Sequence, residues 1–333
     1  MTNTNKPPLS TVSIGGATYD LFLMMGDNIV ETKEKISLPV GGKILVEQVV
    51  ECCGGGACNT SVGLSRLGMS TSFCGVMGAD QWGEKLLETM KGEHVNTAPA
   101  TIVEGETSSF SIVLTLPSGD RTILYTAGAN EHLHDTTFDI DAVDHADAVY
   151  LNHLCETSCM IEDNIISSLV RKPNIKLAWN PGGCQIAAGM GSPDKKALLA
   201  STFLLLLNKE EACEFSGEKT VDGALKALSK TGAAYVCITD GKHGTLATDG
   251  KNIYRCPIAK DVKVIDTTGA GDAFGTAAFW ALITGKSLQV ALVAGTLNAA
   301  SVVGAIGAQA GLLTETQINT IMREQPITVE TVA

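Results

Sequence analysis

Short apolar segments alternate with amphipathic ones along most of this chain. Four apolar runs have the length and composition of buried strands, at residues 146–151, 176–179, 203–207 and 234–238. Segments with helical periodicity lie between them, at residues 160–169, 195–199 and 221–229. Strands that are apolar on both faces and are separated by helices are typical of a parallel sheet covered on both sides. The pattern therefore predicts an α/β protein.

An earlier apolar run at residues 11–17 predicts the first strand of this sheet, and Asp20 lies just past its end. In open α/β sheets, ligands bind beyond the carboxyl ends of the strands. Asp20 is therefore either a ligand-binding acid or an ordinary turn former. Functional polar residues are also expected directly after the later strands.

The helical pattern disappears between residues 101 and 125, where apolar residues alternate and residues 117–120 form a turn. This predicts a hairpin-like insertion. Residues 44–50 are also extended, so the two pieces are expected to form a small β lid, from about residues 29–51 and 101–126, over the ligand end of the main sheet. A hairpin at the edge of the main sheet is the alternative. The whole chain, residues 1–333, is predicted to be one domain with this lid inserted.

Three consecutive glycines, Gly54, Gly55 and Gly56, precede a helical segment at residues 60–67. Glycines at such a turn let a ligand approach the backbone closely. A dinucleotide fingerprint would need glycine where Asn59 stands, so a Rossmann oxidoreductase is disfavoured. Asn59, at the expected helix entry, is either an N-cap or a hydroxyl-binding amide.

Residues 264–282 predict the end of an apolar strand, a turn containing Gly269 and Gly271, and then a helix. Asp266 closes the strand and Asp272 begins the helix. The unpaired N–H groups of such a turn attract an anion, while Asp272 repels it. This conflict is expected if the acid serves a hydroxyl group that attacks a phosphate.

Further polar candidates follow the later strands. Asn208 and Glu211 have a spacing that suits Mg²⁺ or phosphate contacts, and equally a helix-capping box. The turn at residues 239–244 either receives a nucleotide phosphate or joins two strands of a hairpin. Asn298 is the amide expected to be partly buried on an alanine-rich helix at residues 288–303.

Composition narrows the class of protein. The chain has 333 residues, of which 44% are hydrophobic and 18% charged, and a net charge of −12, which disfavours an extended nucleic-acid surface. The ten cysteines form no C-x-x-C pair, which favours reduced thiols. Residues 1–10 lack the apolar core of a signal peptide, and no stretch of about 18 apolar residues exists. We expect a cytoplasmic protein with no nucleic-acid or membrane partner.

Other chemistries lack a candidate site. Neither G-x-S-x-G nor H-E-x-x-H occurs, so neither a hydrolase elbow nor a zinc-protease helix is present. His132, His134 and Asp135 have a metal-like composition, but a hydrophilic loop is more often a solvated turn.

Several motifs in order along the chain resemble those of the ribokinase-like (PfkB-type) carbohydrate kinases. DTTGAGDAF at residues 266–274 is similar to the second signature of that family, and GGGACNTSVGLSRLG at residues 54–68 to the first. Asp20, GVMGADQWG at residues 75–83 and GDRTILYTAGAN at residues 119–130 match in order. The resemblance implies a three-layer α/β/α ribokinase-like sheet with a small β lid.

The resemblance also implies roles for the candidate residues. Asp272 would be the base, and the amides of Gly269, Ala270 and Gly271 the anion hole. The other implied roles are acceptor binding by Asp20, Gly54, Gly55 and Asn59; organisation of Mg²⁺ and phosphates by Asn208 and Glu211; contact with the phosphates of ATP by Thr239, Gly241 and Gly244; and a place near the adenine for Asn298.

Many relatives bind a monovalent cation beside the anion hole. Asp266 and Thr268 match that K⁺ site, and Gly307 is a weaker match. Gly311 stands where ribokinases usually offer a serine. This departure bears directly on whether the cation binds.

The implied activity is ATP-dependent phosphorylation of a primary hydroxyl. Gly56 replaces a lysine usual in ribokinases, so ribose itself is not implied. Residues 54–60 contain no basic residue of the kind that phosphosugar kinases need, so a neutral sugar is expected. A nucleoside kinase is the alternative, with Phe22, Phe110 or Tyr125 as a wall for the base. A non-catalytic sugar- or nucleotide-binding regulator is the alternative of another class. Relatives suggest a homodimer formed through the lid.

Overall fold

The computed structural model describes residues 7–26, 30–32, 35–116, 118, 120–134, 141–154 and 160–332. Residues 29, 33 and 34 of the predicted lid, residues 117 and 119 of its turn, Asp135 and most of the N-terminal segment lie outside these ranges. Within them, no helix is both long and apolar enough to cross a membrane.

A nine-stranded sheet forms the centre of the molecule, in the order β17-β16-β15-β14-β13-β12-β11-β1-β6. Its strands are β1 (Ser10–Ile14), β6 (Ser70–Cys74), β11 (Ala148–Leu151), β12 (Lys176–Trp179), β13 (Leu204–Asn208), β14 (Tyr235–Thr239), β15 (Thr245–Thr248), β16 (Ile253–Cys256) and β17 (Glu330–Thr331). Neighbouring strands pair in parallel along one part of this order, which consists of β6, β1, β11, β12, β13 and β14. The expectation of an all-parallel sheet is wrong at one edge, because β14, β15 and β16 pair antiparallel through short hairpins and β17, from near the end of the chain, pairs antiparallel with β16.

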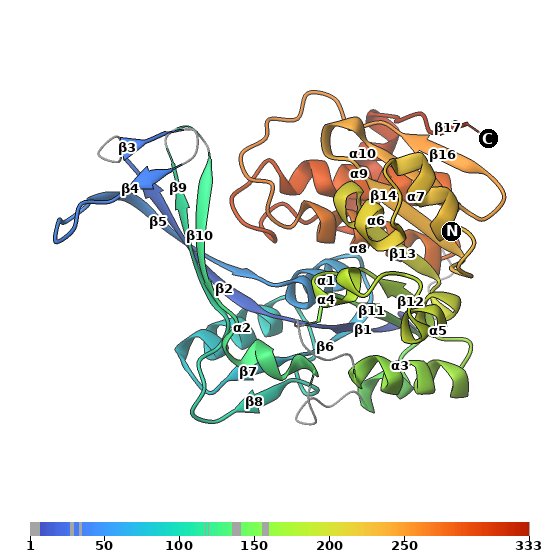
Figure 1. Ribbon diagram of the computed structural model, residues 1–333, viewed down its shortest axis with the longest axis horizontal. Coiled ribbons are helices and arrows are strands. Elements are labelled where there is room, and N and C mark those ends of the chain that lie inside the picture. The colour runs from blue at the N-terminus through green and yellow to red at the C-terminus, as the bar shows by residue number, and fades with distance from the viewer. Residues whose placement is uncertain are drawn as a thin grey trace.

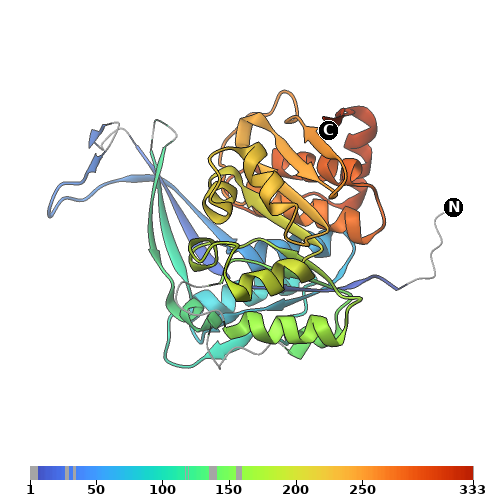
Figure 2. The same cartoon turned by 45° about the vertical axis from the view of Figure 1, so that its right-hand side comes forward.

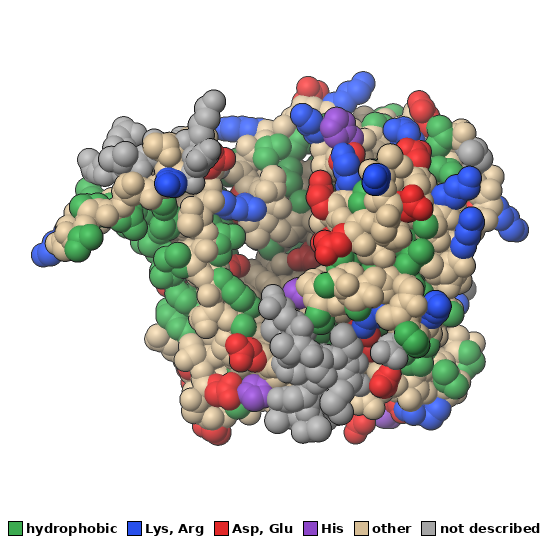
Figure 3. Space-filling view, viewed as in Figure 1, with side chains coloured by type: hydrophobic (Ala, Val, Ile, Leu, Met, Phe, Trp, Pro, Cys, Tyr) green, Lys and Arg blue, Asp and Glu red, His purple; other side chains and the backbone are tan. Residues whose placement is uncertain are grey.

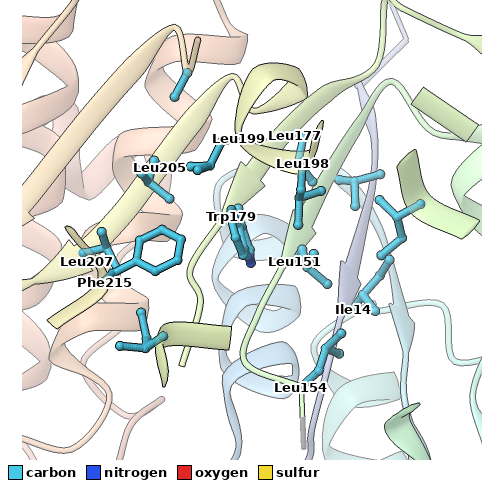
Figure 4. Close-up of a cluster of buried hydrophobic side chains, with 14 of the residues drawn as sticks. Ile14, Leu151, Leu154, Leu177, Trp179, Leu198, Leu199, Leu205, Leu207 and Phe215 are labelled. Carbon is cyan, nitrogen blue, oxygen red and sulfur yellow. The ribbon is translucent and has the colours of Figure 1, made fainter. Parts of the chain in front are cut away.

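Helices cover both faces of this sheet, as predicted (Figure 1). One face carries α3 (Met160–Arg171), α5 (Pro193–Ser201), α6 (Lys209–Ser216) and α7 (Val221–Leu228), and the other α1 (Gly56–Arg66), α8 (Ala270–Ile283), α9 (Leu288–Val302) and α10 (Glu315–Glu324). Figure 4 shows Trp179 of β12 between sheet leucines and Phe215 of α6. The Trp179 and Phe215 rings meet edge to face with centroids 5.8 Å apart. The molecule is a three-layer α/β/α structure.

A second sheet of four strands, in the order β10-β9-β2-β5, projects from this body. Figures 1 and 2 show it rising away from the helical layers. We call it the lid; its strands are β2 (Thr18–Met25), β5 (Val46–Gly54), β9 (Phe110–Thr115) and β10 (Arg121–Thr126). Strand β2 was not expected to be part of it. The chain leaves β1 at Gly15, whose φ of 139° is disfavoured for other residues, and enters the lid directly.

The base of the lid is fixed to α2 (Gln81–Gly92) by three stacked aromatic rings. Trp82 lies between Tyr19 of β2 and Phe110 of β9, with both centroid distances 4.9 Å. Phe110 therefore faces away from the inner side of the lid, and the interpretation of Phe110 as a wall for a base is wrong. Strand alternation places Asp20 and Ser111, the neighbours of Tyr19 and Phe110, on the inner side.

The segment before α8 is not a strand, contrary to prediction. Val264 and Ile265 are about half exposed, at 61% and 50%. The N–H groups of Ile265 and Asp266 donate to the carbonyl of Val303, 2.7 and 3.3 Å away, at the end of α9. Val264 and Ile265 are β-branched, which favours a strand. Their segment is not a strand because the N–H groups of Ile265 and Asp266 donate to the end of a helix and not to a neighbouring strand.

Smaller elements complete the described chain. They are the strand pairs β3 (Val30–Glu31) with β4 (Ile36–Ser37) and β7 (Val76–Gly78) with β8 (Thr101–Val103), the short helix α4 (Cys184–Ala187), and 3₁₀ helices at Gly128–His134, Asp141–His145 and Gly241–His243.

A buried ion pair joins three of the helices on one face. Lys195 of α5 and Glu162 of α3 are 2% and 0% exposed, and their side chains are in contact. The other oxygen of Glu162 accepts a hydrogen bond of 2.7 Å from Gln185 of α4. Removing one partner leaves an uncompensated buried charge.

We therefore expect Lys195→Ala to lower the free energy of unfolding by about 3–5 kcal/mol, measured by urea denaturation. The double variant E162Q/K195M, which removes both charges and preserves volume, is expected to recover most of this loss. A loss of less than about 1 kcal/mol in Lys195→Ala would contradict the structural role of the pair.

Candidate active site

Two cavities meet at the carboxyl edge of the main sheet. The larger has a volume of about 770 Å³ and the smaller about 250 Å³. They share Thr239, Thr267, Ala270, Gly271 and Phe274. Figure 3 shows the molecule hollowed between the lid and the body on this side. A volume of several hundred Å³ is typical of a small-molecule site.

The start of α8 lies where the cavities meet. Its N-cap, Gly269, has a φ of 74°, and no side chain caps the helix. A β-carbon at Gly269 would lie 2.3 Å from that of Ala308, so both the conformation and the space require glycine. Gly271 lines both cavities, and nothing lies within 4 Å of the position of its missing β-carbon. The uncapped amides and the helix dipole favour an anion here.

Asp272 lies beside this anion-binding turn and lines the smaller cavity. Its Oδ2 accepts a hydrogen bond of 2.8 Å from Nδ2 of Asn59. Burial raises the pKa of Asp272 to about 6; the bond from Asn59 opposes the rise and the charge of Glu211 adds to it. A carboxylate with a pKa near the working pH is suited to accept a proton.

Asn59 is not an N-cap, because α1 begins earlier, with Gly55 as its N-cap. Asn59 is buried in the first turn, and Nε2 of Gln309 donates to its Oδ1 over 3.0 Å. This contact fixes which end of the amide faces Asp272. Of the two interpretations of Asn59, the structure favours a functional amide.

Asn208 and Glu211 satisfy both interpretations of their spacing. They form a capping box, in which Glu211 N donates to Asn208 Oδ1 over 2.9 Å and Asn208 N to Glu211 Oε2 over 2.8 Å. Both also line the smaller cavity with Asp272. Burial raises the pKa of Glu211, which the bond from Asn208 partly opposes.

The larger cavity contains the predicted nucleotide turn. Thr239, Gly241 and Gly244 line it, together with the apolar side chains of Ile258, Val262, Val264 and Phe274. Gly244 has a φ of 85°, and a β-carbon there would lie 2.2 Å from the carbonyl of Cys256. A polar glycine turn beside an apolar wall can hold a phosphate and a flat ring.

Asn298 does not line either cavity, contrary to prediction. It is fully buried, its Nδ2 donates to the carbonyl of Ala273 over 2.8 Å, and its Oδ1 accepts from Leu313 N over 2.9 Å. Both polar ends are therefore engaged between α8, α9 and the segment before α10.

Asp20 comes after β1, as predicted, but it lies within lid strand β2 and not in a turn. Its Oδ1 accepts a hydrogen bond from Ser111 of β9. Burial raises the pKa of Asp20 to about 6, the serine opposes the rise and the charge of Asp266 adds to it. A β-carbon at Gly54 would lie 2.1 Å from Asp20 Oδ2, and one at Gly55, with a φ of 88°, 2.6 Å from Ala17 Cα. These glycines leave room for the acid and for the turn into α1.

Asp266, Thr268 and Gly307 are brought together beside the start of α8. Oδ1 of Asp266 accepts from the N–H and the hydroxyl of Thr268, at 3.0 and 2.7 Å, and Oδ2 accepts from Gly307 N at 3.0 Å. Arg121 of the lid also contacts Asp266. Arg121, Ser111 and Asn180 were missed as site residues.

Each missed residue had a weak sequence signal. Asn180 follows β12 directly, lines the smaller cavity and donates to the carbonyl of Leu206 over 3.0 Å. Ser111 and Arg121 are polar residues on the inner face of the lid strands, where inward-facing and outward-facing residues alternate. A polar residue on one face of a strand is usually solvated, so only the paired sheet identifies it as part of a site.

Comparison with known proteins agrees with this geometry. The family model described as pfkB family carbohydrate kinase matches residues 23–315. The chain belongs to this family of carbohydrate kinases. The predicted family is confirmed, and the protein is a phosphotransferase with an alcohol group as acceptor.

Similar pfkB relatives cover most of the chain. A sugar kinase of Archaeoglobus fulgidus described as uncharacterized is 28% identical over 256 residues, 75% of this chain and 98% of its own length. A ribokinase of Bacillus subtilis is 26% identical over 272 residues, 81% of this chain and 87% of its own length.

Solved structures show the same fold. Arabidopsis thaliana ribokinase complexed with ribose and ATP superposes with a TM-score of 0.78 at 23% identity, over 96% of this chain and 99% of that one. Adenosine kinase from Sinorhizobium meliloti gives 0.75 at 20% identity, over 95% and 99%. The predicted ribokinase-like α/β fold is confirmed.

We expect Gly271→Ala to lower turnover of the pfkB kinase by about a hundredfold, because its methyl group would project into the space where the cavities meet. The thermal unfolding midpoint is expected not to fall, since Gly271 has an ordinary helical φ that alanine adopts readily. Gly92→Ala in α2, also with nothing within 4 Å, is the matched control. Wild-type turnover in Gly271→Ala would contradict a phosphoryl site at this turn.

Proposed function

We propose that this protein is a cytoplasmic, ATP-dependent kinase that phosphorylates a primary hydroxyl of a neutral sugar. The observation that supports this most strongly is Asp272, a half-buried acid held by Asn59 beside the uncapped start of α8. An acid with a raised pKa and an anion-binding turn are the two parts that phosphoryl transfer to a hydroxyl needs.

The larger cavity suits ATP, and the inner side of the lid suits the acceptor. ATP would occupy the larger, with its phosphates near Thr239, Gly241 and Gly244 and its γ-phosphate at the amides of Gly269, Ala270 and Gly271. The acceptor would enter from the lid side. Its hydroxyl oxygen bonds to the γ-phosphorus while the bond to the bridging oxygen of ADP breaks, and its proton passes to Asp272.

Mg²⁺ bound with ATP would neutralise phosphate charge. Among the described residues, no group of three or more acidic, histidine or cysteine side chains could form a protein cage for a metal. Mg²⁺ commonly keeps several waters and binds through few carboxylates together with substrate phosphates. Glu211, one of whose carboxylate oxygens is held by Asn208 N while the side chain faces the smaller cavity, fits this arrangement.

The inner side of the lid supports a neutral acceptor. Asp20, held by Ser111, offers a hydroxyl acceptor near Gly54, Gly55 and Asn59. Arg121 is already paired with Asp266, so it is not free for a second phosphate on the substrate. A partly buried carboxylate that orients hydroxyl groups favours a sugar over a sugar phosphate.

A nucleoside is the second candidate acceptor. Tyr125 lies on the same face of β10 as Arg121 and is 59% exposed, so its ring is available to stack on a base. The fold similarity to an adenosine kinase is consistent with this alternative. Exposed apolar residues of the lid, including Val49 and Leu124, support the further proposal of a homodimer formed through it.

An acceptor panel tests the function. The purified protein is incubated with ATP, Mg²⁺ and one of several neutral sugars, nucleosides or sugar phosphates, and ADP release is measured. We expect release with a neutral sugar, and Asp272→Asn to reduce it by about 10²- to 10⁴-fold while ATP binding is retained.

Three outcomes distinguish the alternatives. Release with nucleosides alone would favour the second candidate. No release with any acceptor despite ATP binding would favour a non-catalytic regulator. Near-normal turnover in Asp272→Asn would remove Asp272 from the mechanism.

A further inference from the structure

Arg121 crosses from the lid to the loop before α8. Its Nη1 donates to Oδ1 of Asp266 and, over 2.9 Å, to the hydroxyl of Thr268. Its Nη2 donates to the hydroxyl of Thr267 over 3.3 Å. The arginine side chain is 33% exposed and that of Asp266 is 8% exposed. A lid residue therefore neutralises a nearly buried acid whose loop leads into the anion-binding turn.

Donors surround the carboxylate of Asp266. Thr268 gives Oδ1 two hydrogen bonds besides that from Arg121, and Gly307 N donates to Oδ2. Burial alone would raise the pKa of Asp266, but the bonds from Thr268 and Gly307 and the charge of Arg121 lower it below its ordinary value. Four donors, one of them positively charged, therefore surround this carboxylate, and its positive partner is a side chain of this protein.

These residues do not fit a monovalent metal cation. The family resemblance predicts K⁺ at Asp266 and Thr268, the atoms that the guanidinium contacts. Position 311, where a serine is usual, has no space for a side chain. A β-carbon at Gly311 would lie 2.4 Å from the carbonyl oxygen of Ser301 and 2.6 Å from Cα of Val302. The guanidinium therefore contacts both residues that match the cation site, and the serine that relatives offer at position 311 would not fit here.

We propose that the Arg121 guanidinium takes the place of the monovalent cation, so that the kinase works without K⁺. The inference rests on the proposed kinase activity. Asp266 is three residues before Gly269, and its bare charge would repel a phosphoryl group at the turn. Arg121 acts through Asp266 and Thr267 and is therefore a positioning residue. Of these two partners, Thr267 lines both cavities.

The first test compares turnover of the wild type in tetramethylammonium chloride and in KCl at equal ionic strength. We expect the two rates to agree within about twofold at about 100 mM salt, because an ion that does not bind shifts no equilibrium. Stimulation by K⁺ of about tenfold or more would overturn the proposal.

The second test removes the guanidinium. We expect Arg121→Ala to lose about a hundredfold of kcat, and millimolar guanidinium chloride to restore part of it. Lys43→Ala, which removes an exposed cation just before β5, is the matched control and is expected to keep wild-type turnover. Wild-type kcat in Arg121→Ala would overturn the proposal, and so would a loss that guanidinium leaves unchanged, since that indicates a merely structural role.

A third readout does not depend on activity. The thermal unfolding midpoint of the wild type is expected to be the same in KCl and in tetramethylammonium chloride, whereas a bound ion would raise it. A K⁺-specific rise in the wild type would overturn the proposal. If no acceptor in the panel is phosphorylated, this measurement still decides whether K⁺ binds, so failure of the kinase assignment and failure of the cation inference are distinguishable.

Discussion

The contact between Asn59 and Asp272 is the constraint on which the site depends. It joins α1 to α8 across 213 residues of sequence, and it holds an acid next to amides that attract anions. Burial makes the carboxylate costly, which raises its affinity for a proton. The same desolvation that opposes ionisation therefore gives Asp272 a pKa suited to accept the proton of a hydroxyl group.

The rest of the fold brings groups to this point. Parallel strands end along one edge, so Asn180, Asn208 and Thr239 line the cavities side by side. The lid begins immediately after β1 and returns through β5 into α1, so it is connected covalently to the acceptor side. Its base is fixed by the aromatic stack on Trp82, and its far part contacts the α8 loop through Arg121. In the proposed function, the lid thus carries both a ligand for the acceptor, Asp20, and a charge for the anion-binding turn.

Local signals in the sequence predicted the layered sheet, the glycine turn at Gly269 and the candidate base. They failed where distant contacts decide. Strand β2 was missed because its partners β5 and β9 are separate in sequence. The family resemblance placed Asn298 near the adenine, but in sequence a helical amide looks the same whether it faces a ligand or, as here, bonds Ala273 and Leu313. Arg121 contacts an acid 145 residues away, and no local pattern indicates such a pair.

The most direct test of the account is the pKa of Asp272, measured by NMR of the protein with ¹³C-labelled aspartate carboxyl groups. Asp20 is also expected to titrate near 6, so the signals are assigned with Asp272→Asn and Asp20→Asn. We predict a midpoint of about 6 for Asp272, with kcat/KM falling about tenfold per pH unit below it as the base is protonated. A midpoint near the ordinary value of about 4, with activity unchanged through pH 5, would contradict the account.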